Sequence, residues 1–340
     1  MSGTSTSKSP AGLRHRRSSS STTTTTITES KPVTGLTSPT LTPAQSLPKK
    51  AAKANSRLLL LWDDLPPWRR DNAFIHSGYR DMRASYVHAF QSLFYLHNES
   101  VNIWSHLVGA LVAVACAAYV YYVIHPRYEE ATSSDVFVFA CFFTGAILCL
   151  GMSATYHALS DHSQTVAKWG NKLDYTGIVA LIVGSYVPPM YYGFFCRPVL
   201  MSTYLYLICM LGAGCGVVSW VERFRTPKWR PYRASMFIGL GLSGVVPVIH
   251  GVTIYGYSGL EHRMSISLVI AQGAMYIIGA VLYAMRWPER SSPGSFDIWG
   301  SSHQIFHMFV LLAAATHFYG MAKAFDNHHG LGHAQCVSLE

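Results

Sequence analysis

The segment Phe296–Gly320, FDIWGSSHQIFHMFVLLAAATHFYG, contains two histidines four residues apart at the start of a long apolar run. If the segment is an α-helix, His303 and His307 lie on one face and about 6 Å apart along the axis. This spacing allows both rings to bind one metal ion. The alternative is that each histidine caps or hydrogen-bonds a helix end. Because ionisable groups are costly in lipid and usually mark function there, the pair is a candidate metal site.

The composition around this segment is typical of a membrane protein. Of the 340 residues, 50% are hydrophobic and only 13% are charged, which is unusual for a soluble enzyme. Seven apolar windows are long enough to cross about 30 Å of hydrocarbon as helices. They lie near residues 103–124, 136–157, 173–195, 199–221, 235–257, 264–285 and 303–322. The sequence therefore predicts an all-α membrane protein, a seven-transmembrane helix bundle.

The chain divides into four parts by composition. Residues 1–55 are rich in Ser, Thr, Pro and Lys, and we expect a disordered arm there. Residues 56–102 mix aromatic residues, prolines and charges, which predicts a folded collar. The transmembrane domain covers residues 103–322, and a short tail follows at 323–340.

Part of the predicted collar is apolar at helical spacing. Within residues 84–98, Val87, Phe90, Leu93 and Phe94 fall on one helical face. This pattern indicates an amphipathic helix that lies in the membrane interface. An ordinary helix packed under the bundle would give the same pattern, so both interpretations stay open.

Nearly all of the net charge of +9 lies at the N-terminal end of the chain. The first 60 residues contain nine basic residues and one acid. A basic arm beside a membrane domain favours contact with anionic lipid headgroups over contact with nucleic acid. We therefore expect no nucleic-acid partner.

The loops between the predicted helices differ in their content of Lys and Arg. With a cytosolic N-terminus, the inner loops 158–172, 222–234 and 286–302 hold nine basic residues, and the outer loops hold three. The positive-inside rule therefore puts the N-terminus in the cytosol and the C-terminus outside. Asn98 begins a glycosylation sequon, which this orientation keeps in the cytosol, so a glycan on Asn98 would contradict the orientation.

The cysteines do not form a disulfide framework or a CxxC metal motif. Five of the seven lie within apolar windows, which leaves Cys196 and Cys336 near water. These two can pair if they share a side of the membrane.

Four polar side chains are predicted to lie at one depth, near the cytosolic boundary. With alternating helix directions, His157 closes the second window, Asp174 opens the third, and His303 and His307 open the seventh. Ser153 precedes His157 by one turn and shares its face. Nothing about hydrophobicity requires this layering, so it strengthens the metal interpretation.

Three imidazoles and an open position are typical of a catalytic zinc site. Bound zinc lowers the pKa of water towards about 7 and polarises a carbonyl oxygen. Asp174 is then a candidate proton acceptor, and Ser153 is a candidate hydrogen-bond donor beside the site. The alternatives are that Asp174 interacts with a helix dipole and that Ser153 is a small residue at a helix contact.

Five segments carry a family resemblance: HNESVNIWSH, SATYHALSDHS, KLDYTGIVALIVGSYVP, GLGLSGVVPVIH and the segment quoted first. They closely resemble the adiponectin receptor-like, or progestin and adipoQ receptor, family, also called haemolysin-III-related proteins. The match runs in order from Trp62 to Gly320, and the Ser-rich arm suggests a fungal-type member. The resemblance implies a seven-helix fold with a cytosolic N-terminus. It also implies zinc at His157, His303 and His307, with the Asp174 and Ser153 positions in the same polar cluster.

The family is also similar to alkaline ceramidases, which implies a lipid amidohydrolase that releases a fatty acid and a sphingoid base from ceramide. Fungal-type relatives are linked to zinc and sterol homeostasis, so we expect a role in the plasma membrane or the endoplasmic reticulum. The alternative is a receptor for an extracellular ligand in which zinc is structural. Metal transport is less favoured, because a transporter needs polar groups along a path across the membrane rather than in one layer.

Overall fold

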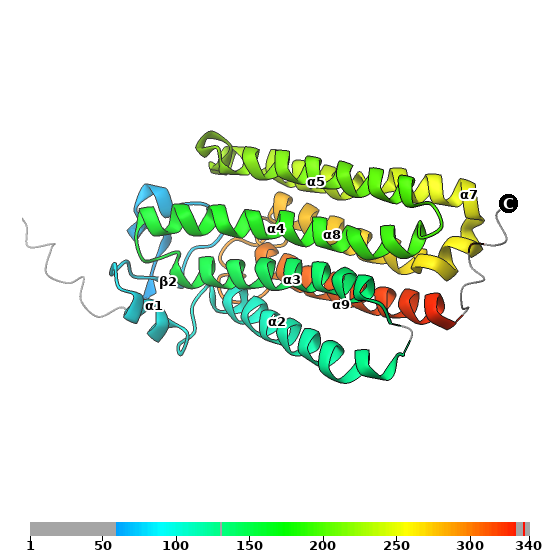
Figure 1. Ribbon diagram of the computed structural model, residues 1–340. Helices are drawn as coiled ribbons and strands as arrows, with labels where there is room; N and C mark the ends of the chain where they lie inside the picture. Colours follow the sequence, from blue (N-terminus) through cyan, green and yellow to red (C-terminus); the bar gives the residue numbers. More distant parts are fainter. Residues whose placement is uncertain (1–58, 130, 331–335, 337–340) are drawn as a thin grey trace, which may run out of the picture. The chain divides into compact units, whose positions relative to one another are not determined.

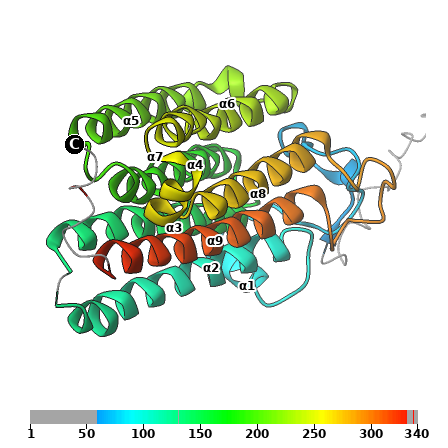
Figure 2. The same ribbon diagram turned by 90° about the vertical axis from the view of Figure 1, so that its right-hand side faces the viewer.

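The architecture is a bundle of long helices that lie side by side (Figures 1 and 2). The computed structural model describes residues 59–129, 131–330 and 336. Within these residues, six helical segments are long and apolar enough to cross a membrane. They are Ser100–Tyr122, Ser133–Leu159, Pro198–Trp220, Pro227–Met264, Ile266–Met285 and Ser302–Gly330. The chain is therefore a multi-pass integral membrane protein. The predicted disordered arm, residues 1–55, lies outside the described residues.

The long segments contain the following elements. They are α2 (Ser100–Tyr119) with the π-helix η3 (Val120–Ile124), α3 (Ser133–Leu159), α5 (Pro198–Trp220), α6 (Arg230–Leu242), α7 (Val245–Met264), α8 (Ile266–Met285) and α9 (Ser302–Gly330). Short 3-10 helices occur at η4 (His125–Arg127), η5 (Glu222–Arg225) and η6 (Pro227–Trp229). A further long helix, α4 (Gln164–Gly193), follows α3. The main apolar core lies between α2, α3, α4 and α9, around Phe142, Leu150, Leu181 and Val310.

Helix α4 covers, with its C-terminal part, residues 173–193 of the predicted third window, 173–195. It is 30 residues long, but it is not one of the six apolar segments. Its first turns carry Lys168, Lys172 and Asp174, and two prolines lie near its end. These residues lower its hydropathy, so composition alone does not identify α4 as a membrane span.

Glycines allow α4 to approach α3 closely. A Cβ atom on Gly177 would lie 2.7 Å from Cα of Cys149, and one on Gly184 would lie 2.5 Å from the carbonyl oxygen of Cys141. Small residues at such positions are a common means of packing membrane helices. The contact places the start of α4, with Asp174, beside the end of α3, with His157.

The fifth predicted helix, 235–257, is interrupted in the structure. Helix α6 ends at Leu242, α7 begins at Val245, and Gly256 has a positive φ of 68° inside α7. The hydroxyl of Tyr186 donates to the carbonyl oxygen of Gly241 at 2.9 Å. Breaks in membrane helices need such partners for the freed backbone groups. The sequence analysis missed the interruption because a hydropathy window averages over it.

The predicted collar contains a two-stranded antiparallel sheet, β1 (Leu59–Leu60) with β2 (Tyr79–Arg80), and the 3-10 helices η1 (Trp62–Asp64) and η2 (Pro67–Arg69). It also contains α1 (Tyr86–Ser92), which is shorter than the helix predicted over 84–98. On and after α1, Val87, Phe90 and Phe94 are 66%, 62% and 72% exposed. This exposure fits contact with the membrane interface.

Arg80 fixes the collar to the end of α3. Its side chain is 1% exposed and lies 3.1 Å from the carboxylate of Asp161. Its guanidinium also donates to the carbonyl oxygens of His157 at 2.6 Å and Ala158 at 2.9 Å. The last carbonyls of a helix lack hydrogen-bond partners within it. Arg80 donates hydrogen bonds to two of these carbonyls and so holds the turn that carries His157.

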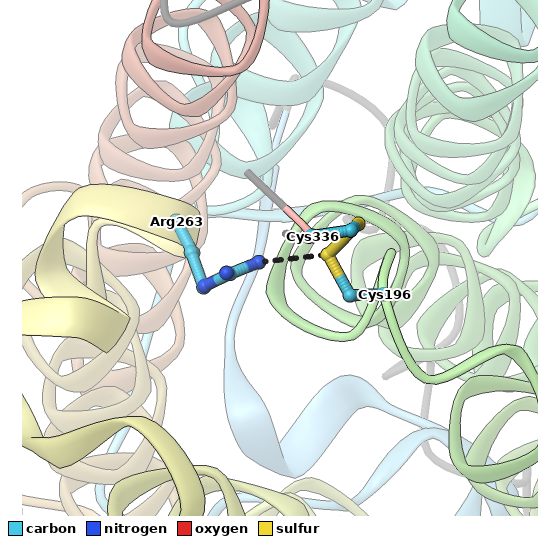
Figure 3. The surroundings of a disulfide bond; sticks show 3 residues. All are labelled: Cys196, Arg263 and Cys336. Atoms are coloured by element: carbon cyan, nitrogen blue, oxygen red, sulfur yellow. Dashed lines mark hydrogen bonds between the residues drawn. A yellow bond between two sulfur atoms is a disulfide. The ribbon is translucent and has the colours of Figure 1, made fainter. Parts of the chain in front are cut away.

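The other end of the bundle carries a disulfide between Cys196, which follows α4, and Cys336 (Figure 3). The guanidinium of Arg263 lies 3.6 Å from the sulfur of Cys196. The structure thus confirms that these two cysteines share a side and pair. Helix α9 continues to Gly330, so the first residues of the predicted tail, 323–340, are helical.

Candidate metal centre

Three histidine rings meet where α3 ends and α9 begins. His157 comes from the last turn of α3, and His303 and His307 come from the first two turns of α9. One nitrogen of each ring lies within 4.8 Å of the other two. Each pair of ring centroids is 4.9 Å apart, at interplanar angles of 71° to 80°. The three residues predicted as metal ligands therefore form one cluster.

The hydrogen bonds of the cluster leave ring nitrogens available for a metal. Nδ1 of His157 lies 2.8 Å from the carboxylate of Glu99, and Nδ1 of His307 lies 3.2 Å from the carbonyl oxygen of Asn102. Nε2 of His157 is buried and has no hydrogen-bond partner in the part of the chain that the structure describes. A buried polar atom without a partner is unfavourable unless a ligand satisfies it. The cluster is thus suited to a metal ion that accepts three imidazole nitrogens, as zinc does.

Glu99 is a site residue that the sequence analysis did not identify. It precedes the first turn of α2, and its carboxylate also accepts a hydrogen bond from the side chain of Asn102 at 2.6 Å. Carboxylates that contact the outer nitrogen of a ligating histidine fix the orientation of its ring. The available signal was position, because an acid at the start of the first window falls in the same layer as Asp174.

The turn that carries Glu99 is held by His97. Burial lowers the pKa of His97 to about 4, so its ring is neutral near pH 7. Nδ1 of the neutral ring accepts a hydrogen bond from the backbone N–H of Glu99 at 3.1 Å. The predicted helix over 84–98 would have continued through His97, whereas α1 ends at Ser92 and His97 lies buried just before the start of α2 at Ser100.

A buried carboxylate supports the start of α9 in a similar way. Glu289 accepts a hydrogen bond from the backbone N–H of Ser302 at 2.7 Å and another from the Ser302 hydroxyl. It also accepts one from the side chain of Asn72, in the collar, at 3.1 Å. Carboxylates are favourable at helix N-termini. The collar therefore contacts both helices that carry the histidine cluster.

The predicted partners of the metal lie on one cavity wall with the histidines. Ser153, His157, Asp174, His303 and His307 all line a cavity of about 920 Å³. Asp174 is 8% exposed and Ser153 is 2% exposed. The structure thus brings Ser153 and Asp174 to the cavity that the cluster faces.

Two further histidines of the sequence take packing positions. His106 of α2 stacks on His307 with ring centroids 3.6 Å apart and planes 8° apart. His317 of α9 lies deeper in the core, against Phe142 at 4.7 Å, and is outside the metal cluster. His317 is ten residues beyond His307, about 15 Å along the helix, so the two rings are too far apart to bind one metal ion.

A membrane helix bundle with a buried three-histidine cluster at one end of an internal cavity defines the class of this protein. The chain belongs to the Haemolysin-III related family, whose pattern it matches over residues 94–318. This result confirms the resemblance noted in the sequence.

The relatives include fungal, animal and plant proteins. The chain is 43% identical over 284 residues to the ADIPOR-like receptor IZH2 of Saccharomyces cerevisiae, covering 83% of this chain and 89% of the relative. It is 44% identical over 262 residues to the Adiponectin receptor protein of Drosophila melanogaster, covering 77% of this chain and 58% of the relative. It is 31% identical to Heptahelical transmembrane protein 4 of Arabidopsis thaliana, covering 76% of this chain and 86% of the relative.

Proposed function

We propose that this protein binds a zinc ion through His157, His303 and His307 and hydrolyses the amide bond of ceramide-like lipids. The observation that supports the proposal best is the buried, unpartnered Nε2 of His157, in a cluster that lines the same cavity as Asp174. A long internal cavity suits a lipid chain, and buried carboxylates in such a cavity are candidates for proton transfer.

Each residue of the site has a separate role in the proposed hydrolysis. Bound zinc would polarise the amide carbonyl and lower the pKa of water. The Asp174 carboxylate accepts the proton from the attacking water and passes it to the leaving nitrogen, which departs as a sphingoid base. The hydroxyl of Ser153, which lines the same cavity, holds the Asp174 carboxyl in position by donating a hydrogen bond to it. The hydrolysis releases a fatty acid, whose chain stays in the cavity until it leaves to the membrane.

The proposal includes seven spans, with α4 as the third, a cytosolic N-terminus and a C-terminus outside. The basic loops predict this orientation. A disulfide between Cys196 and Cys336 supports it, because disulfides persist in oxidising compartments and this bond lies at the end away from the histidine cluster. A glycan on Asn98 would contradict this orientation.

The second candidate function is a receptor for an extracellular ligand, with zinc as a structural ion. The yeast and fly relatives are named as receptors, and these names favour this function. In either role the protein would act in lipid and zinc homeostasis in the plasma membrane or the endoplasmic reticulum. Ligand binding without any lipid turnover would favour the receptor.

Removal of zinc tests the hydrolase proposal directly. The purified protein in lipid nanodiscs is expected to release fatty acid from ceramide, to lose this activity after chelation, and to recover it when zinc is restored. The measurement is fatty acid release by mass spectrometry. If the zinc-loaded protein turns over no ceramide of any chain length, the hydrolase proposal is wrong and the receptor is favoured.

Glu99→Gln tests how the cluster is held. The amide keeps the size of the side chain but removes the charge that orients His157, so zinc affinity is expected to fall roughly 10- to 100-fold. Competition with a chelator of known affinity measures this change. The matched control is Glu222→Gln. Because the Glu222 side chain is 67% exposed, the zinc affinity of this variant should stay at the wild-type value. An unchanged affinity for Glu99→Gln would show that Glu99 does not position the ligand.

A further inference from the structure

The cavity has a second polar region, which lies on α8 at a distance from the level of the histidine cluster. Gln272 and Tyr276 of α8 both line the cavity, and Gln272 is 8% exposed. Among the described residues, neither Oε1 of Gln272 nor the hydroxyl of Tyr276 has a hydrogen-bond partner. The two atoms are therefore not bonded to each other, although residues at i and i+4 share a helix face.

The distance of this polar region from the histidine cluster follows from the helix geometry. Tyr283, on the same helix, contacts the His303 ring with centroids 4.9 Å apart, so it marks the level of the cluster. Tyr276 and Gln272 precede Tyr283 in α8 by about two and three turns, which puts them roughly 10 Å and 16 Å away along the axis. A lipid whose polar end lies at the cluster would pass them with the middle of its chain.

The surroundings make these unpartnered atoms costly. Tyr276 packs against an apolar core cluster, and the side chains that line the same cavity include Val248, Met264, Val269 and Ile277. Ser185 also lines the cavity, but its hydroxyl donates to the carbonyl oxygen of Leu181 at 2.6 Å. A buried polar atom in apolar surroundings is unfavourable without a hydrogen bond. An ordinary alkyl chain would leave both atoms unsatisfied, whereas a hydroxyl group would satisfy both.

We propose that Gln272 and Tyr276 form a subsite for a hydroxyl group in the middle of a lipid chain. A hydroxyl both donates and accepts, so it can donate to Oε1 of Gln272 and accept from the hydroxyl of Tyr276. The substrates are then amide lipids with a hydroxylated chain. This inference rests on the proposed function, because it places the polar end of the lipid at the histidine cluster.

Binding of two fatty acids tests the subsite without any turnover. The probes are 12-hydroxyoctadecanoic acid and octadecanoic acid, which differ by one mid-chain hydroxyl, and the readout is thermal stabilisation of the zinc-loaded protein. For the wild type, the hydroxy acid is expected to reach half of its stabilising effect at a concentration roughly five- to tenfold lower than octadecanoic acid does. The ratio of these two half-effect concentrations measures the preference for the hydroxyl. In Tyr276→Phe the ratio should fall towards one, while zinc content stays unchanged.

The matched control is Tyr255→Phe. The hydroxyl of Tyr255 is also buried and unpartnered, but Tyr255 does not line the cavity, so this variant should keep the preference. Equal stabilisation of the wild type by the two acids would overturn the subsite and leave the proposed hydrolysis standing. Failure of both acids to stabilise the protein would overturn the subsite together with the proposed binding of the fatty acid product.

Discussion

His303→Ala is expected to abolish stoichiometric zinc binding. His303 supplies one of the three ring nitrogens that lie within 4.8 Å of one another, and alanine leaves two ligands. Loss of an outer contact to a ligand weakens zinc binding by roughly 10- to 100-fold, so loss of a ligand itself should weaken it by more than about 100-fold. Elemental analysis of the purified wild type and variant measures the bound metal.

His317→Ala is the matched control for this loss. His317 lies on the same helix and is 3% exposed, so alanine there removes at least as much buried side chain. This variant should keep its zinc, because His317 is outside the cluster. Both variants should elute as the wild type does in size-exclusion chromatography. Equal zinc content in His303→Ala and the wild type would mean that the cluster is not the metal site.

The metal centre could be predicted because its signal is local. Histidines within apolar windows are rare enough to stand out, and two of them at i and i+4 share one face of any helix that contains them. The third, His157, could be assigned because the alternation of helix directions brings the end of one window to the level of the start of another. Both steps depend on hydropathy and helix geometry alone.

The residues that hold the cluster could not be predicted, because their contacts join segments far apart in the sequence. Glu99 reaches His157 across 58 residues, and Arg80 reaches the same turn across 77. Glu289 and Asn72 are separated by 217 residues. An acid or arginine in a loop predicts a solvated charge by default, so the folded structure was needed to show that Arg80, Glu99 and Glu289 support the cluster.

The breaks and ends of helices were the other features that could not be predicted from the sequence. The interruption between α6 and α7 depends on Tyr186 of another helix, which supplies a partner for the Gly241 carbonyl. Helix α1 ends at Ser92, and beyond it His97 lies buried and accepts a hydrogen bond from the backbone N–H of Glu99. In both cases a contact from outside the segment competes with the local preference for helix.

Asp174→Asn is expected to lower ceramide turnover by roughly 100- to 10,000-fold, the usual contribution of a general base. Asparagine has the same shape, but its amide cannot take a proton from water. Zinc content should stay at the wild-type value, because Asp174 is not a member of the three-histidine cluster. The measurements are initial rates of fatty acid release and metal analysis on the same preparation.

The two readouts together decide what Asp174 does. Lost turnover with retained zinc assigns proton transfer to Asp174, whereas loss of both would mean that this carboxylate helps to hold the metal. Asp326→Asn is the matched control, because Asp326 is exposed near the other end of α9, where it accepts a hydrogen bond from Tyr128 at 3.1 Å. This control should keep both zinc and turnover. Wild-type turnover in Asp174→Asn would exclude Asp174 as the base, and the proton would then have to leave through another group of the cavity.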